Sequence, residues 1–244
     1  MIRDPSIWLA AAGIAAAGGA FRGFAGFGSG LLMAPLLALV LSPSLAVPVM
    51  LLLSFAASFR LLPDVRHRVE PRRVAWLAVP AIVTIPVGVW VLTVLDGRLV
   101  QRLISLCVLI LVIFLATGWR HRGRVGALVT VPTGLLSGLL TGVGGVGGPP
   151  VVLLLMSDEA PAETTRANLI AFFAIAQVAA IVTLVVDGLV TRDVLLVFGV
   201  TVPCFLVPLH FGARFFDRTD DETFRRVALV FLGGVALAGL LWPR

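Results

Sequence analysis

The chain has 244 residues, of which 59% are hydrophobic and 13% are charged, and its mean hydropathy is +1.06. Soluble domains carry roughly 25% charged residues, so this composition excludes a soluble globular protein and indicates an all-helical, multi-pass membrane protein. The 19 basic residues are all arginines and give a formal net charge of +6. They cluster between apolar runs, so the positive-inside rule explains them better than nucleic acid binding does.

A membrane-spanning helix needs about 20 apolar residues. The chain contains eight apolar segments, at about residues 7–41, 45–62, 74–95, 99–119, 125–156, 167–186, 194–211 and 227–242. The first and the fifth are too long for one upright helix. The amino end runs directly into the first segment, without the pattern of a cleavable signal peptide.

Each overlong segment contains a stretch rich in glycine and ended by proline. Residues 23–30 read GFAGFGSG and are followed by Pro35, and residues 142–150 read GVGGVGGPP. Both residue types interrupt helices, and unpaired backbone survives in a membrane only where protein or a wet cavity surrounds it. Two broken helices in matching places of two halves are typical of a transporter's binding site.

The order of features predicts an internal repeat of four segments. We expect a first repeat over residues 1–119, a basic cytoplasmic linker at 120–124, and a second repeat over 125–244, together forming one transport domain. Each half opens with a broken helix, and a later segment in each carries two prolines. Since such a site lies between the halves, neither half is expected to be an independent domain.

Arginines place the loop between the second and third segments, and the linker, in the cytoplasm. The arginines around residues 214–226 leave two arrangements open. If both overlong segments cross the membrane fully, the halves are parallel. If both are re-entrant hairpins, the halves are inverted and this arginine-rich region is also cytoplasmic.

Arg22 lies directly before the first glycine run, inside an apolar segment. A charge at the bilayer centre costs about 2.5–3.5 kcal/mol on insertion scales, which makes it a candidate ligand for an anion. The alternatives are an arginine that extends to the lipid headgroups or one that binds the carbonyls of a broken helix.

The breaks themselves expose backbone N–H groups that bind anions at helix amino termini, and glycine lets a ligand approach them. The alternative is close helix packing through GxxxG spacing. The candidate binding residues at the breaks are Gly26, Gly28, Ser29, Gly30, Thr141, Gly142, Gly144, Gly145 and Gly147. Asn168 and Gln177 in the sixth segment, with Ser54 and Ser58 in the second, either line a pathway or bond neighbouring helices.

Other motifs carry no chemistry. Residues 142–147 match GxGxxG, but an apolar membrane run follows where a nucleotide site requires a strand and a helix. The chain has no GxSxG or HExxH motif, so it is not expected to be an enzyme. The histidines and cysteines form no metal-ligating set, and no metal or cofactor is expected.

These residues resemble the TauE/SafE family of membrane transporters, also called the sulfite exporter or toluene-sulfonate uptake permease family. The resemblance covers essentially the whole chain and rests on the GFAGFGSG run with Pro35, the GVGGVGGPP run, the basic loop and the four-plus-four layout. It implies transport of a small, often sulfur-containing anion across a bacterial plasma membrane, coupled to a proton or other ion. Ser29 in the first run and Arg22 depart from the family pattern.

The sequence therefore predicts a secondary transporter for sulfite, an organosulfonate or an organic acid, working by alternating access at the two breaks. An anion channel and a non-transporting scaffold are the alternatives. The chain has no ATP-binding motif, so an ion gradient or the substrate's own gradient would drive transport. The substrate, the direction of transport, the coupling ion and a homo-oligomeric state are left open.

Overall fold

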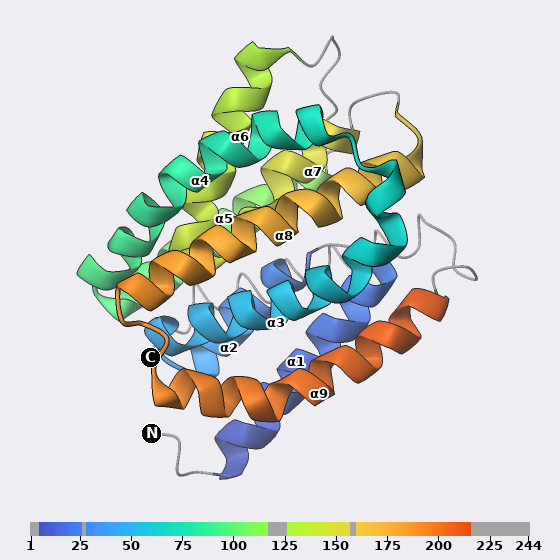
Figure 1. Ribbon diagram of the computed structural model, residues 1–244. Helices are drawn as coiled ribbons and strands as arrows, with labels where there is room; N and C mark the ends of the chain where they lie inside the picture. Colours follow the sequence, from blue (N-terminus) through green and yellow to red (C-terminus); the bar gives the residue numbers. More distant parts are fainter. Residues whose placement is uncertain (1–4, 26–27, 117–125, 157–159, 216–244) are drawn as a thin grey trace.

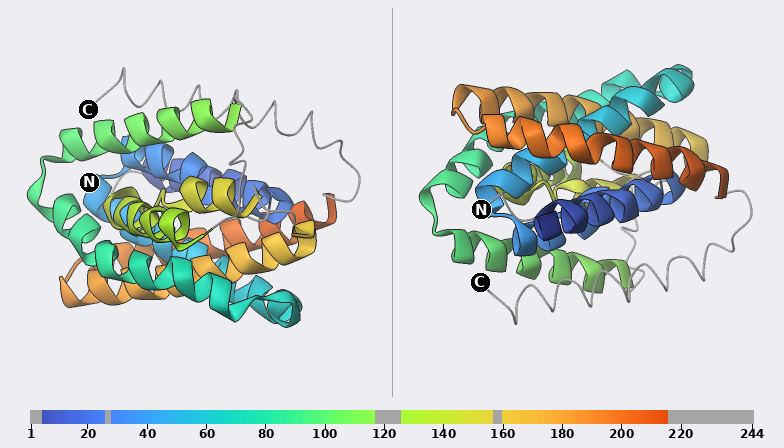
Figure 2. Two further views of the ribbon diagram at one scale, coloured as in Figure 1. Left: turned by 90° about the horizontal axis from the view of Figure 1, so that it is seen from above. Right: turned by 90° about the horizontal axis from the view of Figure 1, so that it is seen from below.

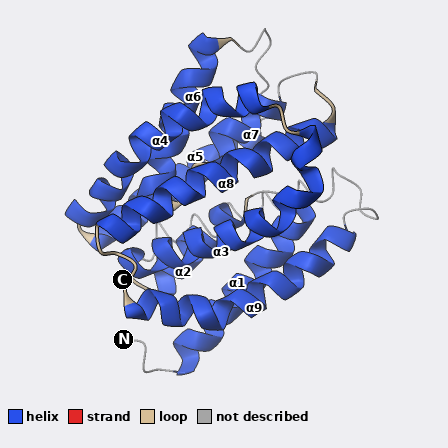
Figure 3. Cartoon of the chain, viewed as in Figure 1, coloured by secondary structure: helices blue, strands red, loops and turns tan. Residues whose placement is uncertain are grey.

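The computed structural model describes residues 5–25, 28–116, 126–156 and 160–215, and within these ranges it contains helices and no strand (Figures 1 and 3). The helices are α1 (Pro5–Ala25), α2 (Ser29–Val40), α3 (Pro43–Val65), a 3-10 turn (Arg66–Arg68), α4 (Pro71–Val94), α5 (Gly97–Ala116), α6 (Ala127–Gly144), α7 (Gly148–Met156), α8 (Ala162–Val186) and α9 (Arg192–Phe215). The first seven predicted segments coincide with these helices. The last, at about 227–242, lies outside the described residues.

Both overlong segments are broken at the predicted glycines. Gly28, with φ +85°, precedes α2, and Gly145, with φ +63°, ends α6. These left-handed backbone conformations are disfavoured for residues that carry a Cβ, so glycine allows each helix to stop and the chain to turn. The interruption of both segments is therefore confirmed.

After each break the chain turns back along the helix that it has just left. Along α1 and α2, Gly18 lies beside Met33, and Arg22 bonds to Ser29, so the two helices are antiparallel. α2 has 12 residues and α7 has 9, lengths of about 18 and 14 Å, against roughly 30 Å for the hydrocarbon core of a bilayer. Each pair is therefore a hairpin with one long arm and one short arm, as in the re-entrant alternative.

Corresponding helices of the two halves run in opposite directions. Arg68, just after α3, forms an ion pair with Glu163 at the start of α8, so α3 and α8 are antiparallel. α6 runs parallel to α4, which follows α3 through a tight turn and so runs opposite to it. α3 runs in the direction of α1, because α2 is antiparallel to α1 and joins α3 through a short turn. α6 therefore runs opposite to α1, and the described helices have the orientation expected of inverted halves.

A stripe of glycines brings α6 onto α4. A Cβ added at Gly134, Gly138 or Gly142 would lie 2.5, 2.1 or 2.4 Å from the backbone oxygen of Leu77, Ala81 or Ile85, respectively. These are GxxxG contacts, in which missing side chains let two helix backbones touch. α1 packs in a similar way on α9, where Gly19 lies against the backbone of Phe205.

The outer surface suits a bilayer. Five of the described helices, α3, α4, α6, α8 and α9, are long and apolar enough to cross a membrane. α4 exposes an apolar face that carries Trp76 and Trp90 near its two ends, as expected of aromatic side chains at the two interfaces of a membrane. In Figure 2, α5 lies on one side and α8 and α9 lie on the other, with α1, α2, α6 and α7 between them.

Candidate functional site

Arg22 is buried in the interior, where side chains from both halves surround it. Only 2% of its surface is exposed, and its Nη1 and Nη2 atoms donate to the hydroxyl oxygens of Ser29 (3.3 Å) and Ser58 (2.6 Å). Ser29 Oγ also lies 3.4 Å from Ser54 Oγ. Since the guanidinium is fixed inside the protein, Arg22 does not extend to the lipid headgroups.

Gln177 of α8 completes this group. Its amide satisfies its surroundings when Nε2 faces the carbonyl oxygens of Ser54 and Phe173, both at 3.1 Å, and Ser58 Oγ at 2.9 Å, so that its two protons bond two of these three oxygen atoms. In the reversed orientation Oε1 would face those two carbonyl oxygens. We call Arg22, Ser29, Ser54, Ser58 and Gln177 the Arg22 cluster.

Two donors of the Arg22 cluster have no acceptor among the described residues. Nε of Arg22 is buried without a hydrogen-bond partner. Ser58 Oγ accepts a hydrogen bond from Arg22, and the amide nitrogen of Gln177 beside it cannot accept one, so the Ser58 proton is left to donate. A buried donor without an acceptor costs about 1–3 kcal/mol, so the cluster has an excess of donors that an oxyanion would satisfy.

No described carboxylate neutralises Arg22. The described acidic side chains are all exposed: Asp64, Glu70, Asp96, Glu163, Asp187 and Asp193. The other groups that contact the guanidinium are neutral, including the ring of Phe173, whose centroid lies 5.7 Å from Arg22 Cζ. Among the described residues, the cluster therefore carries one uncompensated positive charge in a buried environment, and a bound anion would be stabilised there.

The two breaks meet each other next to this cluster. A Cβ added at Gly30 would lie 2.5 Å from the carbonyl oxygen of Gly145, and one added at Gly145 would lie 1.9 Å from Met50 Cε. Ser29, the residue before Gly30, belongs to the Arg22 cluster. The two breaks are therefore in direct contact with each other.

The remaining candidates at the breaks have mainly packing contacts. Gly142 lies against α4, Gly144 against Ile104 of α5, and Gly147 against Ser137 and Thr141. Thr141 donates to the carbonyl oxygen of Ser137, and the Ser137 hydroxyl donates to that of Gly147. The breaks are thus held by close packing, the alternative that GxxxG spacing suggested. Gly26 lies outside the described residues.

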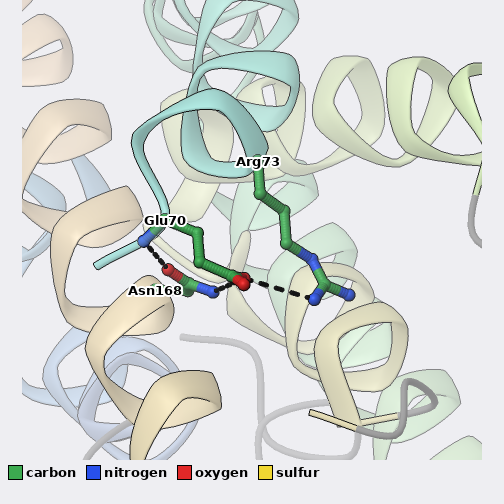
Figure 4. A network of polar contacts seen from close by, with 3 residues as sticks. All are labelled: Glu70, Arg73 and Asn168. Carbon is green, nitrogen blue, oxygen red and sulfur yellow. Dashed lines mark hydrogen bonds and ion pairs between the residues drawn. The ribbon is translucent and has the colours of Figure 1, made fainter. Parts of the chain in front are cut away.

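Asn168 lies apart from the Arg22 cluster, in the network of Figure 4. Its Oδ1 accepts from the backbone N–H of Glu70 at 2.8 Å, and its Nδ2 donates to Glu70 Oε2 at 2.9 Å. Arg73 lies 3.5 Å from the same carboxylate oxygen. With the Arg68–Glu163 ion pair, this network joins the start of α4 to the start of α8. We call the region around Arg68, Glu70, Arg73, Glu163 and Asn168 the arginine-rich end.

A cavity of about 540 Å³ opens at the arginine-rich end, and its wall includes Arg72, Arg73, Glu70, Trp76 and Thr130. None of the side chains that line it belongs to the Arg22 cluster. Among the described residues no group of His, Cys, Asp and Glu could hold a metal ion. The sequence pointed neither to Phe173 nor to the bonds of Glu70, because both depend on which helices become neighbours.

The Sulfite exporter TauE/SafE family model matches residues 10–239. The chain belongs to this family. It is 28% identical over 244 aligned residues to the probable sulfite/organosulfonate exporter TauE of Cupriavidus necator, an alignment that covers 93% of this chain and 91% of that protein. No solved structure matches the chain. Membership in an exporter family, with several helices able to span a bilayer, identifies a multi-pass membrane transport protein.

Proposed function

We propose that the protein is a secondary transporter that moves a small anion across the bacterial plasma membrane. The observation that carries the proposal is Arg22, a buried cation without a carboxylate partner among the described residues and with an unused Nε donor. The name of the Cupriavidus necator relative favours a sulfur-containing oxyanion, sulfite or an organosulfonate, over an organic acid.

In this proposal the anion accepts hydrogen bonds from Nε of Arg22 and from the Ser58 hydroxyl. Ser29 bonds the guanidinium of Arg22, and the amide of Gln177 contacts the Ser58 hydroxyl, so these two residues hold the two donors in place. The amino end of α2 begins at Ser29, and its partial positive charge adds to the attraction. Because Gly30 and Gly145 lack side chains, the backbones of the two breaks approach each other beside this site.

We propose that two inverted four-segment repeats, 1–119 and 125–244, move against each other around this site. The packing between the halves supports this. α1 of the first half packs on α9 of the second, and α6 of the second half packs on α4 of the first. The Arg22 cluster itself draws Ser58 from one half and Gln177 from the other. Rocking of the halves would therefore rebuild the site during each cycle, as alternating access requires.

The arginine-rich end would face the cytoplasm under the positive-inside rule. The cavity there has Arg72 and Arg73 in its wall, and their charge would attract anions from the cytoplasm. The bonds between Glu70 and Asn168, and between Arg68 and Glu163, would close the path from this cavity to Arg22. These contacts would separate when the site opens inward.

Flux into proteoliposomes tests the proposal. Purified protein is reconstituted, and uptake of labelled sulfite, methanesulfonate, taurine, sulfate and acetate is followed with and without a pH gradient. Saturable flux of an anion, with exchange against the same anion on the other side, is the expected result. Flux that rises linearly with concentration would indicate a channel, and flux equal to that of protein-free liposomes for every anion would contradict transport.

A further inference from the structure

We infer that the Arg22 cluster selects singly charged oxyanions and rejects dianions of the same shape. This inference rests on the proposed function of the same site and specifies its substrate class by charge. Hydrogen sulfite, sulfonates and carboxylates belong to the accepted class. Sulfate and the fully ionised form of sulfite belong to the rejected class.

The described part of the site can balance one negative charge. Arg22 is the only charged side chain that is buried among the described residues. The described arginines outside the site, from Arg60 to Arg192, are exposed or half-buried, like the described carboxylates. Among the described residues, one positive charge therefore has to balance whatever charge the ligand brings into the protein.

A second negative charge on the ligand would be costly at this site. An unpaired ion taken out of water costs several kcal/mol in real proteins. Ser29, Ser54, Ser58 and Gln177 provide dipoles but no charge, so a dianion would remain with one uncompensated charge. A monoanion forms a neutral pair with the guanidinium and avoids that cost.

The free donors of the site suit an oxyanion. The ring of Phe173 lies near the guanidinium, and Ser29 and Ser58 already occupy Nη1 and Nη2. The unused Nε and the Ser58 proton provide two donors for one ligand. An oxyanion with two or more oxygen atoms satisfies both, as guanidinium–carboxylate pairs do.

Methanesulfonate and sulfate provide a matched pair of ligands, because both have a tetrahedral sulfur with several oxygen atoms and they differ in charge. Binding to the purified full-length protein is measured by isothermal titration calorimetry at constant ionic strength. We expect methanesulfonate to bind roughly 100-fold more tightly than sulfate, or more. Sulfite changes from monoanion to dianion near neutral pH, so above that point its apparent affinity should fall about tenfold for each pH unit.

The outcomes separate this inference from the proposed function. Equal binding of both anions, or tighter binding of sulfate, would overturn the selection by charge and leave an anion site in place. Binding of none of these anions would overturn the proposed function itself. An Arg22→Lys variant that keeps the charge should keep the preference at lower affinity, whereas a preference that survives in Arg22→Gln would show that another group selects the charge.

Discussion

Substitution of Gly138 by alanine tests whether the glycine stripe holds α6 against α4. The new Cβ would lie 2.1 Å from the carbonyl oxygen of Ala81 and 2.3 Å from Thr84 Oγ1. The carbonyl oxygen of Ala81 belongs to the α4 backbone, and the Thr84 hydroxyl donates to the Leu135 carbonyl of α6. Neither group can therefore move aside without disturbing the α4–α6 contact. The helices therefore have to separate by about 1 Å to restore ordinary van der Waals contact.

Two opposing terms set the magnitude. Overpacking of a tight contact costs typically about 1–3 kcal/mol. Replacement of glycine by alanine inside a helix returns about 1 kcal/mol, because alanine loses less backbone entropy. Gly199 of α9 provides the control, since a Cβ there meets nothing within 4 Å. Gly138→Ala should thus be about 1–3 kcal/mol less stable than Gly199→Ala.

The assay is thermal unfolding of both variants in the same detergent. For a chain of this size 1 kcal/mol corresponds to roughly 2–4 °C, so the melting temperatures of the two variants should differ by about 2–12 °C. Gly199→Ala should equal or exceed the wild type. Equal melting temperatures for the two variants would refute the packing of α6 on α4 through glycine.

Three further predictions concern the site and its surroundings. Gly30→Ala should lower the initial flux into proteoliposomes about 5- to 150-fold. Its Cβ would press on Gly145 and separate the two breaks at a cost of about 1–3 kcal/mol. Flux at the wild-type level would contradict the contact between the breaks. Ser58→Ala should lower the free energy of unfolding by about 1–3 kcal/mol, since it removes the acceptor of Arg22 Nη2, whereas the exposed Ser44→Ala should change it by less than about 0.5 kcal/mol. Asn168→Leu should speed proteolysis of the loop around Glu70 that Asn168 bonds, and an unchanged digestion rate would show that this bond does not hold the loop.

Several features of the fold could be predicted because they are local in the sequence. Runs of apolar residues predicted the helices from α1 to α9, and glycine with proline predicted both breaks. Arg22 could be singled out since a charge in an apolar segment requires compensation. The sequence left the direction of the halves open, because hydropathy does not distinguish a full crossing from a hairpin whose second arm, such as α2, is short.

The members of the Arg22 cluster could be predicted only in part. The sequence groups Asn168 with Gln177 because both are polar residues of one segment. They are nine residues apart, which at 100° per residue places them about 180° apart and roughly 13.5 Å along the helix. They therefore lie on opposite faces of α8, which helical periodicity alone indicates. Ser54 and Ser58, at i and i+4, do share a face.

The packing glycines also show what the sequence could not decide. Gly134, Gly138 and Gly142 fit both a GxxxG stripe and an extension of the second break. Only the position of α4 distinguishes these, since the stripe needs a facing backbone. In contrast, Gly145 and Gly30 face each other, which joins residues that are more than 100 positions apart in the sequence.

The most direct test of whether Arg22 holds the transported anion is the flux of the preferred anion through the Arg22→Gln variant. This variant is reconstituted in proteoliposomes beside Arg98→Gln. Arg98 is exposed at the start of α5, so its loss controls for the removal of a positive charge elsewhere. We expect Arg22→Gln to insert and fold but to lose saturable flux and anion binding, while Arg98→Gln retains both. Wild-type flux and affinity in Arg22→Gln would contradict the claim that this buried arginine holds the transported anion.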